Sequence, residues 1–277
     1  MKSKFQLLVL ATLVLLLGAC TPEYKVSITA TNNINAPALQ SFSHASSGVE
    51  WLLFAGRTNS KSTYDGGLHN LNANYADSSF VPPSFNEDIF VYNVETDEVP
   101  HKISITQMIN TVVEKHPTSY SKDSLHKYRH VFKNTNALVR QKGDYVYVLG
   151  GYGAKDSVGA NGYITYNHVA KIHVPSMIAL VKGNYSEVDE AKLFAFGQNE
   201  NLVSTGGEMY AIGDQFYLVG GHNFGKTAVN GQKYVDAVYP FRFKEKHPAH
   251  VLNIGVGTAI SDVSDPKGAA SDDTSIF

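Results

Sequence analysis

Hydrophobic residues cluster in short runs that end in glycine, and one such phrase occurs three times. The copies occupy residues 48–56, 143–151 and 213–221. Each opens with glycine, continues with a run rich in Val, Leu, Phe and Tyr, and ends in Gly-Gly, or in Ala-Gly in the first copy. Glycine tolerates the positive φ of a tight hairpin turn, and the apolar run suits a strand covered on both faces. The phrase therefore predicts a turn, a buried strand and a sharp exit.

Further predicted strands flank each copy. One precedes it, at residues 39–45, 135–140 and 207–212, and another follows it, at 88–93, 168–174 and 236–243. Repetition of this kind favours a solenoid or a propeller. We therefore predict an all-β fold of three units of about four strands: unit one over about 39–100, unit two over 134–188 and unit three over 201–256, with an outer strand at 251–256.

Residues 101–134 interrupt the β pattern. Ile105, Met108, Ile109 and Val112 recur at helical spacing, which predicts a short helical insertion near 105–115 with Thr106 as its N-cap. A helical turn is also expected at 175–181.

His126 and His130 stand four residues apart and, on a helix, would present two imidazoles to a metal. No carboxylate or cysteine at ligand spacing completes a metal set, and Lys127 and Arg129 add unfavourable charge. We interpret this stretch as a solvated polar connector, and we predict neither a metal site nor a cofactor.

The composition narrows the class of protein. The chain has 277 residues, 43% of them hydrophobic, which is enough for a sizeable core in one domain or two small ones. The formal net charge of −2 carries no electrostatic signature of nucleic-acid binding, so we expect no nucleic-acid partner.

The N-terminus has the pattern of a secretory leader. Lys2 and Lys4 precede an apolar run from 5 to 17, followed by small residues. Leu17-Gly18-Ala19-Cys20 resembles a bacterial lipobox, and Cys20 is the only cysteine in the chain. We predict a lipoprotein signal peptide over 1–19, lipidation of Cys20 and an acylated tether over 20–37. The partner of this end is a lipid bilayer.

The order of strand, Gly-Asp turn, strand ending in Gly-Gly, long loop and strand with an aromatic resembles the kelch repeat. In that repeat each copy forms one four-stranded blade of a β-propeller. The segment from Tyr92 to Thr96 also matches the kelch pattern, and the resemblance covers about residues 37–260. It implies a kelch-type β-propeller of the galactose-oxidase superfamily, with about three recognisable blades over 38–260.

Together with the leader, this looks like a kelch-repeat lipoprotein of Gram-negative outer membranes. Thr21, where an aspartate would favour inner-membrane retention, indicates passage to the outer membrane. We expect a lipid anchor there, with the propeller facing the periplasm or the cell surface.

The remaining tail, 261–277, is polar and supplies no further blade. Propellers close with four to eight blades. We therefore expect an incomplete propeller, favouring truncation of a longer chain over atypical closure or closure by association.

A propeller gathers equivalent loops on one face. The loops 57–87, 152–167 and 222–235 should therefore lie side by side and present polar and aromatic side chains to a ligand. The expected ligand face comprises Arg57, Tyr64, His69, Tyr152, Tyr166, His222, Asn223 and Phe224, with Tyr234 nearby.

No catalytic set is visible in the sequence. We therefore predict a binding or scaffold protein for a protein or glycan partner. The alternative is a carbohydrate-active enzyme, because related kelch propellers include a sugar oxidase and a sialic-acid mutarotase. The oxidase needs a cysteine that the folded part lacks. For a mutarotase-like isomerase, Arg57 with Asp65 or Glu87 would supply the Arg and acid pair.

Overall fold

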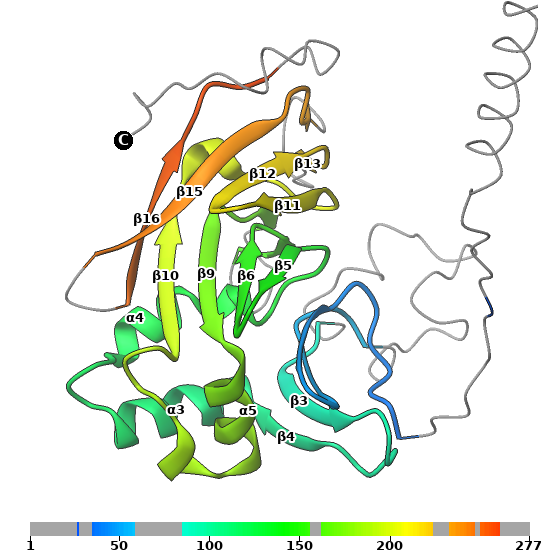
Figure 1. The fold of residues 1–277 in the computed structure, drawn as a ribbon, viewed down its shortest axis with the longest axis vertical. Helices are drawn as coiled ribbons and strands as arrows, with labels where there is room; N and C mark the ends of the chain where they lie inside the picture. The colour runs from blue at the N-terminus through cyan, green and yellow to red at the C-terminus, as the bar shows by residue number, and fades with distance from the viewer. Residues whose placement is uncertain are drawn as a thin grey trace, which may run out of the picture. The chain divides into compact units, whose positions relative to one another are not determined.

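The computed structural model describes residue 27 and residues 35–58, 85–155, 162–223, 233–246 and 250–260. The chain over these residues is mostly β, with three α-helices among the described elements (Figure 1). The predicted leader and lipidation site at Cys20, and the tail 261–277, lie outside the described residues. None of the described helices is both long enough and apolar enough to span a membrane.

All three repeated phrases form the predicted strand. In each unit it is the second of four antiparallel neighbours, and the turn before it is a tight hairpin. Unit one consists of β1 (Ser43–Ser47), β2 (Glu50–Phe54), β3 (Asp88–Asn93) and β4 (His101–Ser104). Unit two consists of β5 (Leu138–Lys142), β6 (Tyr145–Leu149), β9 (His168–His173) and β10 (Phe194–Gln198). Unit three consists of β11 (Glu208–Ile212), β12 (Gln215–Val219), β15 (Tyr239–Lys246) and β16 (Val251–Val256).

The sheets differ from three separate blades. Unit one is a four-stranded sheet, but units two and three share one eight-stranded sheet in the order β11-β12-β15-β16-β10-β9-β6-β5. The junction is a parallel pairing of β10 with β16, where the Phe196 N–H donates to the His250 carbonyl at 3.0 Å. Gly197 permits it, because a Cβ there would lie 2.4 Å from the Leu252 carbonyl oxygen. The end strands β5 and β11 also contact each other, so this sheet is barrel-like and nearly closed.

Unit boundaries also shift. The fourth strand of unit two, β10, begins after the predicted end at residue 188 because helix α5 (Val174–Lys182) and the 3₁₀ turn η3 (Tyr185–Glu187) come first. Two small hairpins extend beyond the paired glycines of units two and three. They are β7 (Tyr152–Ala154) with β8 (Tyr163–Thr165), and β13 (His222–Asn223) with β14 (Lys233–Tyr234).

The helical insertion is helix α3, Ile105–Lys115, but its predicted N-cap is wrong. Ser104 caps the helix: its hydroxyl accepts from the Gln107 N–H, and the Gln107 side chain accepts from the Ser104 N–H. This reciprocal pair satisfies two donors and fixes the start of the helix at Ile105, the first residue of the hydrophobic run. Ile105, Met108, Ile109 and Val112 are buried, as the spacing predicted.

Each unit packs one face on the next unit. Leu52 and Phe54 of unit one meet Val146 and Val148 of unit two in the larger core, to which helices α3 and α5 contribute. The opposite face of unit two, with Leu138 and Leu149, meets unit three in a second core that contains Phe216 and Leu218. We call the side of a unit that packs on the following unit its leading face, and the opposite side its trailing face.

The same main-chain hydrogen bonds join consecutive units. The Gly56 N–H donates to the Asn134 carbonyl at 2.7 Å, and the Gly151 N–H donates to the Ser204 carbonyl at 3.0 Å. In return, the Asn136 N–H donates to the Ser41 carbonyl at 3.1 Å, and the Gly206 N–H donates to the Asn136 carbonyl at 2.9 Å. Ser41, Asn136 and Gly206 hold equivalent positions and all have positive φ, of 52°, 54° and 68°. One docking geometry is therefore used twice.

Candidate functional site

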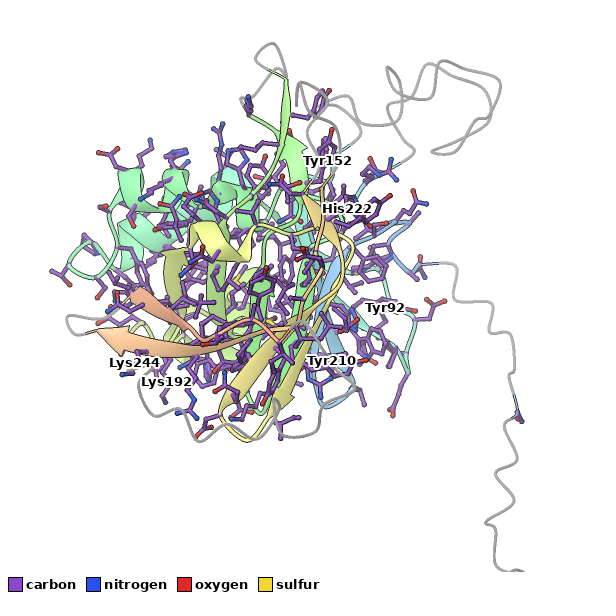
Figure 2. All side chains as sticks on the ribbon, turned by 90° about the horizontal axis from the view of Figure 1, so that it is seen from above. Tyr92, Tyr152, Lys192, Tyr210, His222 and Lys244 are labelled. Atoms are coloured by element: carbon purple, nitrogen blue, oxygen red, sulfur yellow. The ribbon has the colours of Figure 1, made fainter. Side chains whose placement is uncertain are left out.

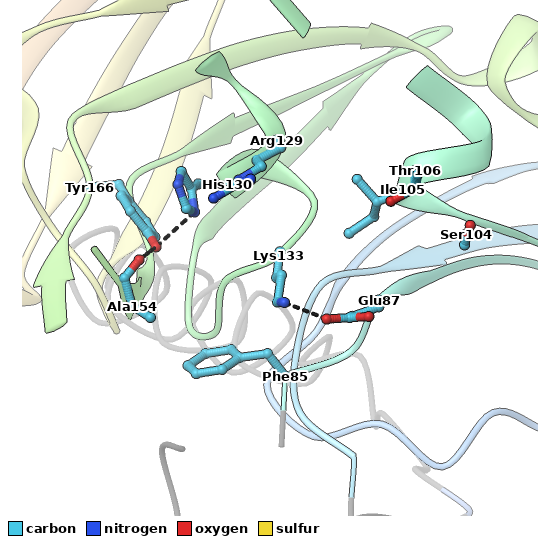
Figure 3. Close-up of a pocket in the computed structure, with 10 residues that line it drawn as sticks. All are labelled: Phe85, Glu87, Ser104, Ile105, Thr106, Arg129, His130, Lys133, Ala154 and Tyr166. Carbon is cyan, nitrogen blue, oxygen red and sulfur yellow. Dashed lines mark hydrogen bonds and ion pairs between the residues drawn. The ribbon is translucent and has the colours of Figure 1, made fainter. Parts of the chain in front are cut away.

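A pocket of about 130 Å³ opens between units one and two (Figure 3). Its charged side chains and its serine and threonine come from the approach to β3, the start of helix α3 and the turn that follows helix α4 (Lys122–Lys127). The Tyr166 hydroxyl, just after β8, adds a further polar group. Its lining residues are Phe85, Glu87, Ser104, Ile105, Thr106, Arg129, His130, Lys133, Ala154 and Tyr166. The pocket thus combines an apolar wall with a group of charged and hydroxyl side chains.

The turn that carries Arg129 and His130 is η2 (Arg129–Val131), a short 3₁₀ helix. Fully buried Asn134 holds it in place, because its side-chain amide donates to the His130 carbonyl at 2.8 Å and to the Val131 carbonyl at 3.2 Å. Val131 and Phe132 anchor the same segment in the core. The two side chains therefore project from a fixed backbone.

Positive charge dominates the polar part of the pocket. Lys133 forms an ion pair with Glu87. Arg129 has no carboxylate within salt-bridge distance among the described residues. Helix α3 begins at the pocket with no acidic residue in its first turn, so the partial positive charge of its N-terminus adds to that of Arg129. The net arrangement favours an anion.

Two hydrogen bonds set the tautomer of His130, and its surroundings set its charge. The Tyr166 hydroxyl donates to the Ala154 carbonyl at 2.5 Å, and its oxygen lies 2.9 Å from His130 Nδ1. Because the tyrosine proton is committed to the carbonyl, His130 must donate from Nδ1. Burial, and then the charge of Arg129, lower the pKa of His130 to about 4. His130 is therefore neutral at physiological pH.

Aromatic rings stack on the two residues of this hydrogen-bonded pair. Tyr166 stacks on His130 with ring centroids 4.6 Å apart and on His168 at 5.6 Å. Burial lowers the pKa of His168 to about 4 as well, and burial raises the pKa of the Tyr166 hydroxyl. The cluster presents neutral rings, so the cationic character of the pocket comes from Arg129 and Lys133.

The predicted ligand-face residues do not form one open surface. Arg57 and Tyr152 follow the glycines of units one and two but are 2% and 4% exposed. Of the predicted ligand-face residues that the structure describes, Tyr166 alone lines the pocket. His222, marked with Tyr152 in Figure 2, is half-buried, while Asn223 and Tyr234 are exposed. Tyr64, His69, Phe224 and the considered acid Asp65 lie outside the described residues.

The Arg and acid pairing considered for a mutarotase takes another form. The Arg57 side chain donates to Gln40 Oε1 at 3.0 Å, and Glu87 pairs with Lys133 instead. Glu87 does line the cationic pocket, but the arginine that shares this pocket with it is Arg129 and not Arg57.

Sequence reasoning missed Arg129, Lys133, Ser104 and Thr106. All four belong to the inserted stretch 101–134. For its first part the sequence predicted only a short helix with Thr106 as the N-cap, and for the part around His126 and His130 it predicted a solvated polar connector. Part of that stretch is a half-buried pocket wall. His126 and His130 do not share a helix, since α4 ends at Lys127, and no metal-ligand group of three is present among the described side chains.

The sequence matches no protein-family model, and it matches no curated protein at a significant level.

Proposed function

We propose that this chain is a membrane-anchored, kelch-type β-propeller that binds an acidic glycan through the pocket at Arg129. The propeller assignment is supported by three four-stranded units that follow one sequence phrase and dock with the same main-chain hydrogen bonds. A barrel formed by units two and three would not explain why the contact between units one and two uses the same hydrogen bonds as the contact between units two and three. The parallel junction of β10 and β16 is then a local addition at the outer edge.

The observation that carries the binding function is Arg129. A half-buried guanidinium without a carboxylate partner among the described residues, beside a helix N-terminus, is suited to a carboxylate, which it can hold with two parallel hydrogen bonds. Lys133 and the hydroxyls of Ser104 and Thr106 line the same space and suit the hydroxyl groups of a sugar. Phe85 supplies an apolar surface against which a sugar ring packs.

The size of the pocket indicates which part of a ligand enters. A volume of about 130 Å³ is below the roughly 300–1,000 Å³ that encloses a complete small-molecule ligand. The pocket would therefore take one terminal group of a larger molecule, with the rest of the molecule outside. A terminal sugar acid of a glycan fits this description.

Titration calorimetry with glucuronate and glucose tests the proposal. Wild-type protein should bind glucuronate and discriminate against glucose, which lacks the carboxylate. Arg129→Gln should weaken glucuronate binding at least about tenfold, the loss expected for one charge-assisted contact. Arg140→Gln, which removes an exposed arginine on β5, should leave it unchanged. Equal affinities for the two sugars, or equal effects of the two variants, would refute the proposal.

The anchor is a separate part of the proposal. We propose that acyl chains on Cys20 hold the protein in the bacterial outer membrane, with the propeller on the periplasmic side or at the surface. Mass spectrometry of the membrane-extracted protein should show an N-terminal diacyl or triacyl cysteine, and Cys20→Ser should abolish this modification. A mature N-terminus without acyl chains in the unmodified sequence would contradict the anchor.

A further inference from the structure

Unit three presents a leading face like the ones already used by units one and two. In those two units the glycine that ends the phrase donates its N–H to the next unit, from Gly56 and from Gly151. The equivalent donor of unit three is Gly221, at φ 83°, and it has no acceptor among the described residues. The equivalent of the Ser41 and Asn136 carbonyls is the carbonyl of Gly206. The main chain of unit three is therefore arranged to receive a further unit.

Exposed apolar side chains lie on this same face. Tyr210 and Ile212 on β11 are 52% and 71% exposed (Tyr210 is marked in Figure 2). Tyr210 holds the position of Ala45 in unit one, which is 1% exposed because unit two covers it. Large apolar side chains at such positions indicate a surface that is covered in an assembly.

Unit one presents the matching trailing face. Trp51 is 39% exposed, whereas the equivalent residues Val146 and Phe216 are 0% and 3% exposed beneath the preceding unit. Phe42, on the same side of unit one, is 37% exposed, and His44 stacks on Trp51 with ring centroids 5.8 Å apart. These two faces, on which Tyr210, Ile212, Phe42 and Trp51 are left exposed, correspond to the two halves of an interface that the described units already form twice.

We propose that a second copy of this chain covers both faces, with unit three of each copy docking on unit one of the other. A head-to-tail contact either closes into a ring or continues as an open fibre. Two copies of the three described units make six, within the four to eight blades with which propellers close. The two contacts are identical, so the ring has two-fold symmetry. This inference rests on the propeller assignment proposed above.

Analytical ultracentrifugation of the full chain carrying Cys20→Ser, which prevents acylation, tests the ring. The expected species has twice the 30.2 kDa mass of one chain. Ile212→Glu and Trp51→Glu, on opposite halves of the interface, should each shift it to one chain mass. Ile164→Glu, at a 38% exposed position on β8 of unit two, should remain a dimer.

Hydrogen exchange separates failure of the ring from failure of the propeller. Protected Gly56 and Gly151 amides with a fast-exchanging Gly221 amide in a monomeric chain would overturn the ring and leave the propeller standing. Fast exchange at Gly56 and Gly151 would overturn the propeller itself. Species larger than two chains would show an open fibre and overturn closure, and a dimer that survives Ile212→Glu and Trp51→Glu would place the contact elsewhere.

Discussion

Replacing Gly151 with alanine tests how the repeated phrase supports both the fold and the pocket. Gly151 has φ 88°, and a Cβ there would lie 2.8 Å from Cγ and from Oδ1 of Asn134. The side chain of Asn134 holds the turn with Arg129 and His130 through its two hydrogen bonds. The added methyl group therefore strains the backbone and displaces the residue that positions the pocket.

The expected loss in the free energy of unfolding is the sum of these two effects. A non-glycine residue in the left-handed region costs roughly 1–2 kcal/mol, and loss of buried hydrogen bonds adds about 1–3 kcal/mol. Gly151→Ala should thus lower the free energy of unfolding by about 2–5 kcal/mol. Gly143→Ala is the matched control, because Gly143 has φ 57° and open space around its Cβ position. It should cost only the roughly 1–2 kcal/mol of the backbone effect.

Urea unfolding with linear extrapolation measures both variants. Adding Asn134→Ala removes the two closest contacts and leaves Ala137 Cβ at 3.1 Å, so the cost of Gly151→Ala in that background should fall towards that of Gly143→Ala. Equal destabilisation by Gly143→Ala and Gly151→Ala in the wild-type background, or additive effects of Gly151→Ala and Asn134→Ala, would contradict the clash with Asn134.

Three further predictions concern the cluster and the inserted helix. Tyr166→Phe should destabilise the fold by about 1–3 kcal/mol because the Ala154 carbonyl and His130 Nδ1 lose their partner. The control Tyr234→Phe, at a 72% exposed tyrosine, should leave thermal unfolding unchanged. Burial lowers the pKa of His130 and of His168 from 6.5 to about 4, so the unfolded chain binds more protons between these values and stability is lost as pH falls from about 6.5 to 4. The loss in the free energy of unfolding should approach about 1.4 kcal/mol per pH unit for each histidine. Urea unfolding at several pH values should show a weaker dependence of stability on pH for the His130→Gln and His168→Gln double variant. An unchanged dependence would contradict the lowered pKa values of these two histidines. Ser104→Ala removes the N-cap of helix α3 and should cost about 1 kcal/mol in denaturant unfolding, whereas Thr106→Ala, one position beyond the true helix start, should cost less; the reverse order would contradict the capping assignment.

The strands could be predicted from the sequence because the apolar runs and the glycines at the turns indicate the same strand boundaries. The turn glycines Gly48, Gly143 and Gly213 all have positive φ, and the strand that follows each is paired as expected. Helix α3 was predictable from its apolar spacing, although its cap was misplaced because Ser104 and Thr106 are both good caps. Intrinsic preference alone could not separate them; the Gln107 side chain, which completes the capping box, was the available signal.

The junction of units two and three could not be predicted in the same way. It depends on a close approach at Gly197 between strands far apart in the sequence, and an isolated glycine in a strand carries no information on its partner. The pocket was missed for a similar reason. Arg129 and Lys133 lie in a stretch without strong periodicity, and only tertiary packing by Asn134 and Phe132 brings them to helix α3.

Mapping the glucuronate site by amide chemical shifts tests most directly whether the pocket at Arg129 binds a sugar acid. Titration of isotopically labelled protein should shift the amides of Ser104, Thr106, Arg129 and Lys133, and Arg129→Gln should abolish those shifts while the rest of the spectrum is retained. Shifts confined to another part of the chain, or shifts at these residues that glucose reproduces equally, would contradict an anion-selective glycan site in this pocket.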